Sequence, residues 1–486
     1  PPRSTQSRSS AASDVYKRQS YARAVASIRK HIAAGDTYQV NFTFRLRAKA
    51  PPDPWALFLR LWQAQPVPCA AWLDAGHTAI ISLSPERFFD VHGETITCRP
   101  MKGTARRGRW TEEDDACRQR FAASAKDRAE NIMIVDMVRN DLGRIAEFGS
   151  VAAGPLCQIE TYRTVFQMTS VVRARTRAPL SRVLQALFPS ASITGAPKVR
   201  TMEIIAALEP SPRGVYCGAI GCIAPGRRWL FNVPIRTIEI RRESRTALYG
   251  IGGGVTWDST AEGEYREALQ KALAVMQPDP PFVLLETMRW ASGTGVFLWR
   301  EHLARLCRSA RYFGFPEPNA VALREAVEDA ARASGASPLR VRLLYDAQGH
   351  FRIETRPLSA SPPQPWVRLA LDDQPTDPDS RWLFHKTTYR ALYDAARARH
   401  PEADDVVLWN TRGEVMETTI ANIAVRLGGV WWTPPTACGL LPGTLRARLL
   451  RRGCLRERVL TLTDLRRADG LVLMNSVRGL QRACLV

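Results

Sequence analysis

The sequence has no apolar run near the roughly 20 residues that cross a bilayer, and no charged-then-apolar leader at its start. It therefore predicts a soluble, cytoplasmic protein without a membrane partner. Cysteines are few and scattered: ten lie between Cys69 and Cys484, and the closest two, Cys217 and Cys222, lack the two-residue spacing of a zinc or redox motif. A disulfide scaffold would be shorter and denser in cysteine, so free thiols in a reducing cytosol are expected.

Acidic residues are fewer than basic residues. The chain carries 68 Lys and Arg against 47 Asp and Glu, a formal net charge of +21. The excess is mostly arginine spread over the whole length, without a long basic block or a basic stripe interleaved with aromatic residues, which is typical of a solvated surface. We therefore expect no nucleic-acid partner. A basic nucleic-acid-binding protein with degenerate enzyme folds stays open, and salt-dependent DNA binding would support it.

The sequence does contain enough apolar material, 45% of 486 residues, for roughly three compact units. Residues 1–20 have no usable periodicity and are expected to be an unstructured tail. Three prolines within residues 277–281 end the preceding helix and predict a boundary between one domain at 21–277 and another at 278–486. A second proline-rich stretch, Ser359 to Pro365, is expected to separate two lobes of the second domain.

Periodicity predicts individual elements in the first domain. Apolar residues at helical spacing cover 126–142 and 262–276, and alternation over Leu230–Ile240 predicts a strand. Strands and helices do not alternate regularly, so the expected class is α+β rather than a doubly wound sheet.

Two pairs of carboxylates on these helices are spaced three residues apart: Asp127 with Glu130, and Glu264 with Glu267. Residues three apart share a helix face, so each pair can present two carboxylates together. Two such faces would form an oxygen-rich site suited to Mg²⁺. Taken alone, each pair is better explained as acidic residues on an exposed helix surface than as part of a metal site.

A set of short sequence motifs, called words below, favours the metal site over the exposed surface. In chain order they are Ala34–Asn41, Ser84–Glu86, Asp127–Arg144, Ser192–Lys198, Tyr216–Gly221 and Gly252–Ser259. Together they resemble the chorismate-utilising enzymes over roughly residues 20–277, and their order makes the resemblance specific. It implies an antiparallel β-sandwich surrounded by helices, with chorismate as the substrate.

The resemblance also implies roles for single residues. Glu130 and Glu267 should bind Mg²⁺, with Asp127 and Glu264 beside them. Arg236 and Tyr216 should hold the enolpyruvyl carboxylate. The remaining substrate contacts are expected from Gly103, Thr104, Thr194 and the backbone N–H groups of Gly252, Gly253 and Gly254.

One word helps to choose among the activities of this family. Pro100–Thr104 resembles the Pro-Ile-Lys-Gly-Thr word of aminodeoxychorismate synthases, whereas anthranilate synthases usually have alanine in place of the lysine. The resemblance implies that Lys102 adds at C2 of chorismate and expels the C4 hydroxyl, after which ammonia enters at C4 and the lysine leaves. Glu86 is expected to be the general acid/base at the departing hydroxyl. Gln167 stands where many relatives have histidine, which mildly supports this choice.

The source of ammonia and the extent of the domain are further expectations. No Gly-x-Cys-x-Gly elbow is visible, so ammonia is expected from solution or from a separate glutamine amidotransferase subunit. The family pattern begins near Tyr21, where relatives have much more upstream sequence. We therefore expect a partial synthase domain, and an inactive truncated relic is one alternative.

The second domain offers a lysine that could form a Schiff base, Lys386, and an acid that could pair with a pyridinium nitrogen, Glu417. The words around them are, in chain order, Leu285–Arg289, Glu301–Leu306, Phe384–Arg390, Asn410–Asn422, Gly439–Arg446 and Asn475–Gly479. They resemble fold-type IV pyridoxal-phosphate enzymes, the group of branched-chain aminotransferases and aminodeoxychorismate lyases. The resemblance implies a two-lobed domain and pyridoxal 5′-phosphate as cofactor.

By that resemblance Lys386 holds the cofactor and removes the C4 proton of aminodeoxychorismate, and Glu417 pairs with the pyridine nitrogen. Thr287 should help protonation. The other cofactor contacts are expected from Arg305, Gly443, Thr444, Asn475 and Ser476. A homodimer through this domain is also expected.

Aminotransferases share these words, so an anthranilate-type synthase fused to a class IV aminotransferase stays open. Consecutive steps on one chain favour the lyase, which eliminates pyruvate and leaves 4-aminobenzoate for folate biosynthesis.

Overall fold

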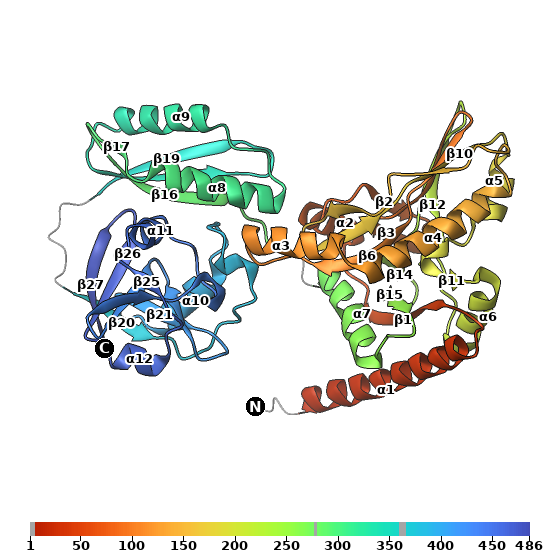
Figure 1. Ribbon diagram of the computed structural model, residues 1–486, viewed down its shortest axis with the longest axis horizontal. Coiled ribbons are helices and arrows are strands. Elements are labelled where there is room, and N and C mark those ends of the chain that lie inside the picture. The colour runs from red at the N-terminus through yellow and green to blue at the C-terminus, as the bar shows by residue number, and fades with distance from the viewer. Residues whose placement is uncertain (1–4, 277–278, 359–365) are drawn as a thin grey trace. The chain divides into compact units, whose positions relative to one another are not determined.

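The chain divides into two compact units in a computed structural model that describes residues 5–276, 279–358 and 366–486 (Figure 1). The first unit comprises Pro1–Arg107 with Arg118–Asp279, and the second comprises Gly108–Cys117 with Pro280–Val486. The expected boundary at Gln277 and Pro278 and the expected separator at 359–365 lie outside the described residues.

The first unit is built on antiparallel sheets. One sheet has the order β11-β1-β15-β14-β3-β2, from β1 (Gln39–Lys49), β2 (Cys69–Asp74), β3 (Thr78–Ser84), β11 (Gly195–Ala196), β14 (Thr237–Arg241) and β15 (Thr246–Val255). Another has the order β12-β13-β4-β5-β10-β7, from β4 (Arg87–His92), β5 (Thr95–Cys98), β7 (Ala152–Ala153), β10 (Val172–Arg175), β12 (Ile220–Ala224) and β13 (Arg228–Asn232). A small sheet, β6-β9-β8, consists of β6 (Met101–Arg106), β8 (Gln158–Thr161) and β9 (Val165–Thr169).

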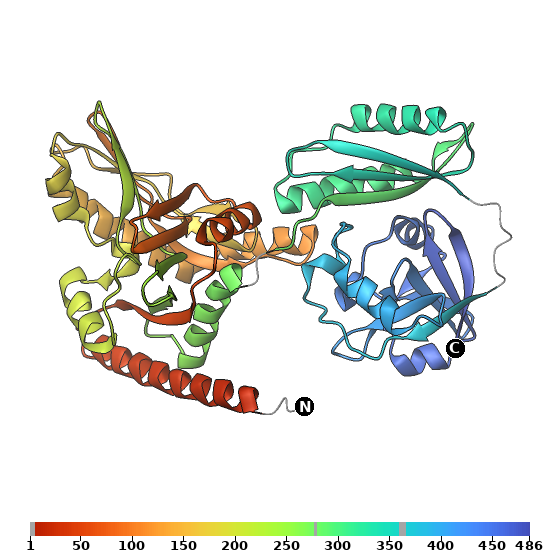
Figure 2. The same cartoon turned by 180° about the vertical axis from the view of Figure 1, so that it is seen from behind.

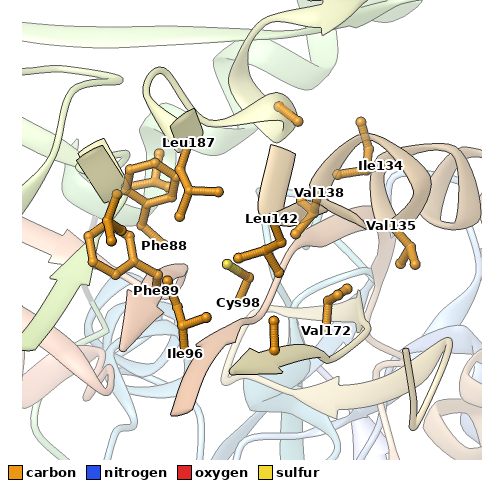
Figure 3. Close-up of a cluster of buried hydrophobic side chains, with 14 of the residues drawn as sticks. Phe88, Phe89, Ile96, Cys98, Ile134, Val135, Val138, Leu142, Val172 and Leu187 are labelled. Atoms are coloured by element: carbon orange, nitrogen blue, oxygen red, sulfur yellow. The ribbon is translucent and has the colours of Figure 1, made fainter. Parts of the chain in front are cut away.

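Helices cover these sheets and bury their apolar faces. They are α1 (Thr5–Ala33), α2 (Pro54–Ala64), α4 (Ala125–Gly143), α5 (Leu180–Leu187), α6 (Lys198–Leu208) and α7 (Ala261–Met276), with a short 3-10 turn at Ala191–Ile193. Helix α4 begins after Ser124, whose hydroxyl accepts the backbone N–H of Asp127. Its buried face, including Ile134, Val138 and Leu142, meets β4 and β5 in the core drawn in Figure 3. The predicted helices at 126–142 and 262–276 are thus confirmed.

Two sequence predictions differ from the structure. Helix α1 begins at Thr5, inside the stretch expected to be unstructured, because alanine and arginine continue the helix that Tyr21 and Ile28 anchor in the core. The strand expected over Leu230–Ile240 is two strands, β13 and β14. Pro234 removes a backbone donor between them, and Arg236 adopts a left-handed conformation with φ of 51°.

The second unit contains two more sheets. A four-stranded antiparallel sheet has the order β17-β16-β18-β19, from β16 (Leu284–Ala291), β17 (Gly295–Val296), β18 (Leu339–Tyr345) and β19 (Phe351–Pro357). A mixed sheet has the order β22-β21-β20-β27-β26-β23-β24-β25, from β20 (Val367–Leu371), β21 (Asp405–Trp409), β22 (Val415–Thr418), β23 (Asn422–Leu427), β24 (Val430–Thr433), β25 (Arg456–Glu457), β26 (Gly470–Asn475) and β27 (Gly479–Leu485).

The helices of the second unit are α8 (Trp299–Phe313), α9 (Ala320–Ala333), α10 (Ala391–Arg399), α11 (Thr444–Arg451) and α12 (Leu462–Arg466), with 3-10 turns at Arg381–Leu383 and Thr436–Cys438. Helices α8 and α9 pack on the four-stranded sheet and share its core (Figures 1 and 2). The segment Gly108–Cys117, with the start of α3 (Thr111–Ala122), also belongs to this unit. There the hydroxyl of Tyr312 donates to the carbonyl of Gly108 at 2.8 Å.

The arrangement confirms the expected α+β class. All ten cysteines are free thiols, also as expected. Among the described residues, no helix combines the length and the apolar character needed to span a bilayer.

Candidate active sites

In the first unit, Lys102 lies at an irregularity in the small sheet. The pairing of β6 with β9 shifts register between Met101 and Thr104, and Gly103 takes a φ of 96° there. A bulge of this kind re-aims the neighbouring side chain. Asn131 holds the bulge in place, because its amide donates to the carbonyl of Lys102 at 3.1 Å and to that of Met168 at 3.0 Å.

Charged groups surround the Lys102 amine. Burial lowers the pKa of Lys102, and Lys271 lowers it further, whereas Glu130, Glu267 and Glu264 raise it. The structure therefore brings three of the four predicted metal-binding carboxylates to this lysine. A lowered pKa increases the fraction of the neutral, nucleophilic amine.

Glu86 lies close enough to Lys102 for the two charges to interact, and it is only 3% exposed. Burial raises the pKa of Glu86 to about 7, although the hydroxyl of Ser192 donates to its Oε1 at 2.5 Å and opposes the rise. A carboxyl that titrates near neutrality can both donate and accept a proton at physiological pH.

The acidic pairs are engaged with neighbouring side chains. Ser124 donates to Asp127 at 2.5 Å, Ser259 to Glu264 at 2.7 Å, and Lys271 lies 2.8 Å from Glu267. The described residues contain no group of three or more side chains arranged to hold a metal ion. Mg²⁺ commonly binds through one or two protein carboxylates, with water and substrate completing its shell. The residues around Lys102 fit a metal held in that way.

Arg236 and Tyr216 have the surroundings of an anion site. No carboxylate in the described chain pairs with Arg236, and burial lowers its pKa while Tyr249 and Tyr162 oppose the shift. A desolvated guanidinium without a counter-ion favours an anionic ligand. Tyr216 packs against Gly250, and Arg45 lies 4.8 Å from the Tyr216 ring centroid.

The glycine run is part of a strand rather than a loop. Gly252, Gly253 and Gly254 lie on β15 and pair with β1 along one edge, whereas β14 pairs only with residues 246–249 of β15. Their other edge therefore has no strand partner in the described chain, and the carbonyl of Gly252 accepts a hydrogen bond from the Lys271 amine at 3.0 Å. A Cβ on Gly254 would lie 2.4 Å from the Lys102 Nζ and 2.1 Å from the Gln39 Nε2, so the ends of both side chains lie against this strand.

Two predicted substrate-binding hydroxyls have partners within the protein. Thr194 donates to the carbonyl of Ser190 at 3.0 Å, and Thr104 donates to Gln167 at 3.2 Å. Neither hydroxyl proton is free for substrate in this arrangement.

Sequence reasoning did not assign roles to Asn131, Ser192, Lys271 and Gln39. Gln39 is 1% exposed, and its Oε1 has no hydrogen-bond partner among the described residues. Asn131, Ser192 and Gln39 lie within the motif words, and that position is the sequence signal that could have identified them as site residues. Lys271 lies outside these words.

In the second unit, every residue predicted to bind the cofactor lines one cavity of roughly 350 Å³. These residues are Lys386, Glu417, Arg305, Gly443, Thr444, Asn475 and Ser476, and Thr287 lines the same cavity. Burial lowers the pKa of Lys386 to about 8, with a contribution from Arg305, and burial raises that of Glu417 to about 7. The two groups influence each other electrostatically across the cavity.

Three hydrogen bonds fix the Glu417 carboxylate. Tyr393 donates to its Oε1 at 3.0 Å, the backbone N–H of Leu441 to the same oxygen at 3.1 Å, and Asn422 to its Oε2 at 3.0 Å. A buried carboxylate held in this way fits a pyridinium nitrogen, which would supply the missing positive charge.

A buried ion network fixes Arg305. Its Nε and Nη2 donate to Glu286 at 2.9 and 2.6 Å, and His302 Nδ1 lies 2.6 Å from the same carboxylate. His302 Nε2 in turn lies 3.4 Å from the hydroxyl of Thr444, the first residue of α11. Helix α11 begins after Gly443, where a Cβ would lie 1.9 Å from Asn422 Oδ1. A guanidinium beside free N–H groups at a helix start fits a phosphate.

The network itself was not predicted. Glu286 and His302 stand within the motif words, but nothing in their spacing showed that they pair with Arg305. The loop after β26 was predicted in part: Ser476 donates to the carbonyl of Thr287 at 3.3 Å, and Asn475 accepts the backbone N–H groups of Val477 and Arg478.

Comparison with known proteins agrees with this two-site arrangement. Residues 1–277 match the family described as chorismate binding enzyme, more than half of the chain. The chain belongs to the chorismate binding enzyme family. Residues 283–486 match the amino-transferase class IV family, so both enzyme domains expected from the sequence are present on one chain.

Similar proteins share the first unit. The aminodeoxychorismate synthase of Streptomyces griseus is 44% identical over 54% of this chain and 36% of its own length. Aminodeoxychorismate synthase component 1 of Escherichia coli is 40% identical over 54% of this chain and 57% of its own length. This chain therefore spans between about a third and three fifths of these relatives.

The anthranilate synthase component I structure from Streptococcus pneumoniae is also similar. It is 31% identical, with a TM-score of 0.50 over 54% of this chain and 58% of that one. The two activities therefore share one fold, so the fold cannot choose between them.

Proposed function

We propose that this chain converts chorismate and ammonia into aminodeoxychorismate in its first unit, and aminodeoxychorismate into 4-aminobenzoate and pyruvate in its second. The observation that carries the first half is Lys102, a desolvated lysine beside a carboxyl of raised pKa. The class IV domain on the same chain, with its Lys386–Glu417 cavity, carries the second half. The product would serve folate biosynthesis.

The first-unit chemistry follows from the residues around Lys102. The neutral amine adds at C2 of chorismate, both ring double bonds shift by one position toward C4, and the C4 hydroxyl departs as water with a proton from Glu86. Ammonia then adds at C4, both double bonds shift back, and Lys102 leaves from C2. Arg236 and Tyr216 would hold the enolpyruvyl carboxylate during both additions.

Mg²⁺ belongs to this proposal. Glu130 and Glu267 would hold it, with Asp127 and Glu264 beside them, and the metal would supply positive charge at the ring carboxylate. Ammonia would come from a separate glutamine amidotransferase subunit, since the Escherichia coli relative is named component 1 of its synthase.

In the second unit, pyridoxal phosphate, when bound, supplies an electron sink for the amine-bearing carbon. Lys386 would bind the cofactor covalently and move the C4 proton of the substrate, for which a pKa near 8 is suited. Glu417 would keep the ring nitrogen protonated. Arg305 and the start of α11 would bind the phosphate, and Thr287 would help to protonate the departing enolpyruvyl group. A homodimer through this unit stays a prediction that sedimentation can check.

Fluorescence detection of 4-aminobenzoate from chorismate, ammonium, Mg²⁺ and pyridoxal phosphate tests the proposal. We expect product from the full chain. Lys102→Ala should abolish it but retain cleavage of supplied aminodeoxychorismate, and Lys386→Ala should lead to accumulation of aminodeoxychorismate. Anthranilate as the product would refute the role of Lys102. Transamination of amino acids without cleavage of aminodeoxychorismate would refute the lyase and favour a class IV aminotransferase.

A further inference from the structure

The turn between β22 and β23 forms part of the wall of the cofactor cavity. All four of its residues, 418–421, line the cavity, and they follow Glu417 directly. The turn is closed by its own hydrogen bonds, because the backbone N–H of Thr418 donates to the carbonyl of Ala421 at 2.9 Å and the N–H of Ala421 donates to the Thr418 hydroxyl at 3.1 Å. A contact that holds this turn therefore also helps to place Glu417.

Asp405 holds the turn from outside the cavity. It is the first residue of β21, is 1% exposed and is not among the described residues that line the cavity. Its Oδ1 accepts the hydroxyl of Thr419 at 2.5 Å and the backbone N–H of Thr419 at 3.2 Å, as well as the N–H of Val406 at 2.9 Å. The Arg397 guanidinium lies 3.7 Å from the same oxygen. Hydrogen bonds to a charged acceptor are stronger than those between neutral groups, so Asp405 anchors Thr419 firmly.

The second oxygen of Asp405 is buried but has no hydrogen-bond partner among the residues that the structure describes. A buried acceptor without a partner destabilises the folded state. Stability alone therefore does not explain a carboxylate at this position, and buried groups of this kind call for a functional explanation. The contacts of Asp405 indicate that this function is to place Thr419.

Thr419 in turn holds a cation of the cavity, Arg390. The Arg390 Nη2 donates to the carbonyl of Thr419 at 2.7 Å, which is the one hydrogen bond that Arg390 makes among the described residues. Its guanidinium carbon lies 4.9 Å from the ring centroid of Tyr393, and the exposed carboxylate of Asp394 lies 3.8 Å from its Nε. The backbone of Thr419 therefore connects Asp405, outside the cavity, to a charge inside it.

The position of Arg390 affects both reactive groups of the cavity. Burial lowers the pKa of Lys386 most, and the charges of Arg305 and Arg390 lower it further, whereas Glu286 and Glu417 raise it. Burial raises the pKa of Glu417, and Arg390 is among the groups that oppose this rise. Arg305 and Glu286 fix each other in the buried network described above, so Arg390 is the cation whose position depends on the turn.

We propose that Asp405 and Thr419 are positioning residues that hold Arg390 in the cofactor cavity, beside Lys386 and Glu417. The inference rests on the proposed cofactor site, and it is the same for a lyase and for an aminotransferase. Asp405 acts through the turn and not by contact with substrate or cofactor. When the turn is released, Arg390 can move away from Lys386, and the amine then holds its proton more tightly because less positive charge is near it.

The test titrates the Lys386 amine in the full chain without cofactor, by trace acetylation with acetic anhydride against pH and mass spectrometry of the labelled peptide. Thr419→Val removes the hydroxyl at nearly constant shape, whereas Thr419→Ser keeps it. We expect the midpoint of labelling, near pH 8 in the wild type, to rise by roughly half a pH unit or more in Thr419→Val. Thr419→Ser should restore the wild-type midpoint. Thr411→Val, at an exposed threonine of the same unit, is the matched control and should not change it.

Two further variants show whether the effect passes through Arg390. Arg390→Gln should raise the midpoint as well, and Thr419→Val should add nothing to it in that background. Asp405→Ala should also raise the midpoint, whereas loss of a negative charge without movement of Arg390 would lower it. A wild-type midpoint in Thr419→Val, or equal shifts from Thr419→Val with and without Arg390, would overturn the inference. If the chain binds no pyridoxal phosphate, the proposed function of the second unit fails, and the labelling still decides the role of Asp405 and Thr419 because it needs no cofactor.

Discussion

The ring of Tyr216 occupies the space that a side chain on Gly250 would need: a Cβ there would lie 2.3 Å from the Tyr216 ring. Tyr216 stands on the loop before β12, and Gly250 belongs to β15, in a different sheet. The glycine therefore lets the tyrosine approach the strand that carries Gly252–Gly254, beside the proposed substrate site.

This contact predicts that Gly250→Ala displaces Tyr216 and impairs the first reaction only. The added methyl group should cost roughly 1–3 kcal/mol of local overpacking and raise the KM for chorismate. Cleavage of supplied aminodeoxychorismate should not change. Gly143→Ala is the control, because Gly143 ends α4 with open space around it. Equal chorismate kinetics in the two variants would contradict the prediction.

The hydrogen bond from Ser192 to Glu86 predicts a shift in a pH profile. The bond stabilises the ionised carboxylate and lowers a pKa that burial has raised to about 7. Ser192→Ala should therefore raise the pKa of Glu86 further. If Glu86 must be protonated to release the C4 hydroxyl, the alkaline limb of the synthase reaction moves to higher pH.

The measurement is the rate of chorismate amination against pH at a constant concentration of free ammonia. Ser150→Ala, which removes an exposed hydroxyl of the same unit, should leave the profile in place. An alkaline limb that moves to lower pH in Ser192→Ala would show that Glu86 does not act as the acid.

The buried network predicts a loss of stability in Glu286→Gln that the phosphorylated cofactor partly restores. Removing one partner leaves Arg305 with an uncompensated buried charge, which costs roughly 3–5 kcal/mol. Pyridoxal phosphate should restore more of this stability than pyridoxal, because its phosphate would supply the negative partner that Arg305 has lost. Glu301→Gln on the same helix is the control, because its ion-pair partner Arg451 is exposed rather than buried.

The same network has a defined pH dependence. Arg305 and His302 lower the pKa of Glu286 to about 2, despite its burial, from an ordinary 4.5. A carboxyl with a depressed pKa stabilises the folded state fully above pH 4.5, and this contribution is lost as the pH falls from 4.5 toward 2. Thermal unfolding should therefore separate wild type from Glu286→Gln at neutral pH and separate them less at pH 3.

The core in Figure 3 predicts a local stability effect on α4. Leu142 is fully buried, so Leu142→Ala should destabilise the first unit by roughly 2–5 kcal/mol. Ile132 lies on the same helix but is 40% exposed, and Ile132→Ala should change the free energy of unfolding by less than about 0.5 kcal/mol. Hydrogen exchange of the α4 amides measures both, and equal exchange in the two variants would contradict this description of the core.

Local sequence patterns were sufficient to predict several helices of this protein. Helical periodicity predicted α4 and α7 to within one residue at each end, because an apolar stripe at that spacing is buried only in a helix. The strand pattern over Leu230–Ile240 was less reliable. Alternation continued across Pro234, but a proline cannot donate to the ladder, and the chain passes there from one sheet to another.

By itself, the sequence determined the class of the fold, the two enzyme domains and the residues that meet in the cofactor cavity, because short words with fixed chemistry carry that information. Tertiary structure alone decided how those residues are tuned. The pKa of Glu86 depends on Ser192, 106 positions away, and Arg305 is fixed by Glu286, 19 positions earlier. Pairings of this kind, like the desolvation that shifts Lys102 and Lys386, arise only when folding buries distant segments against one another.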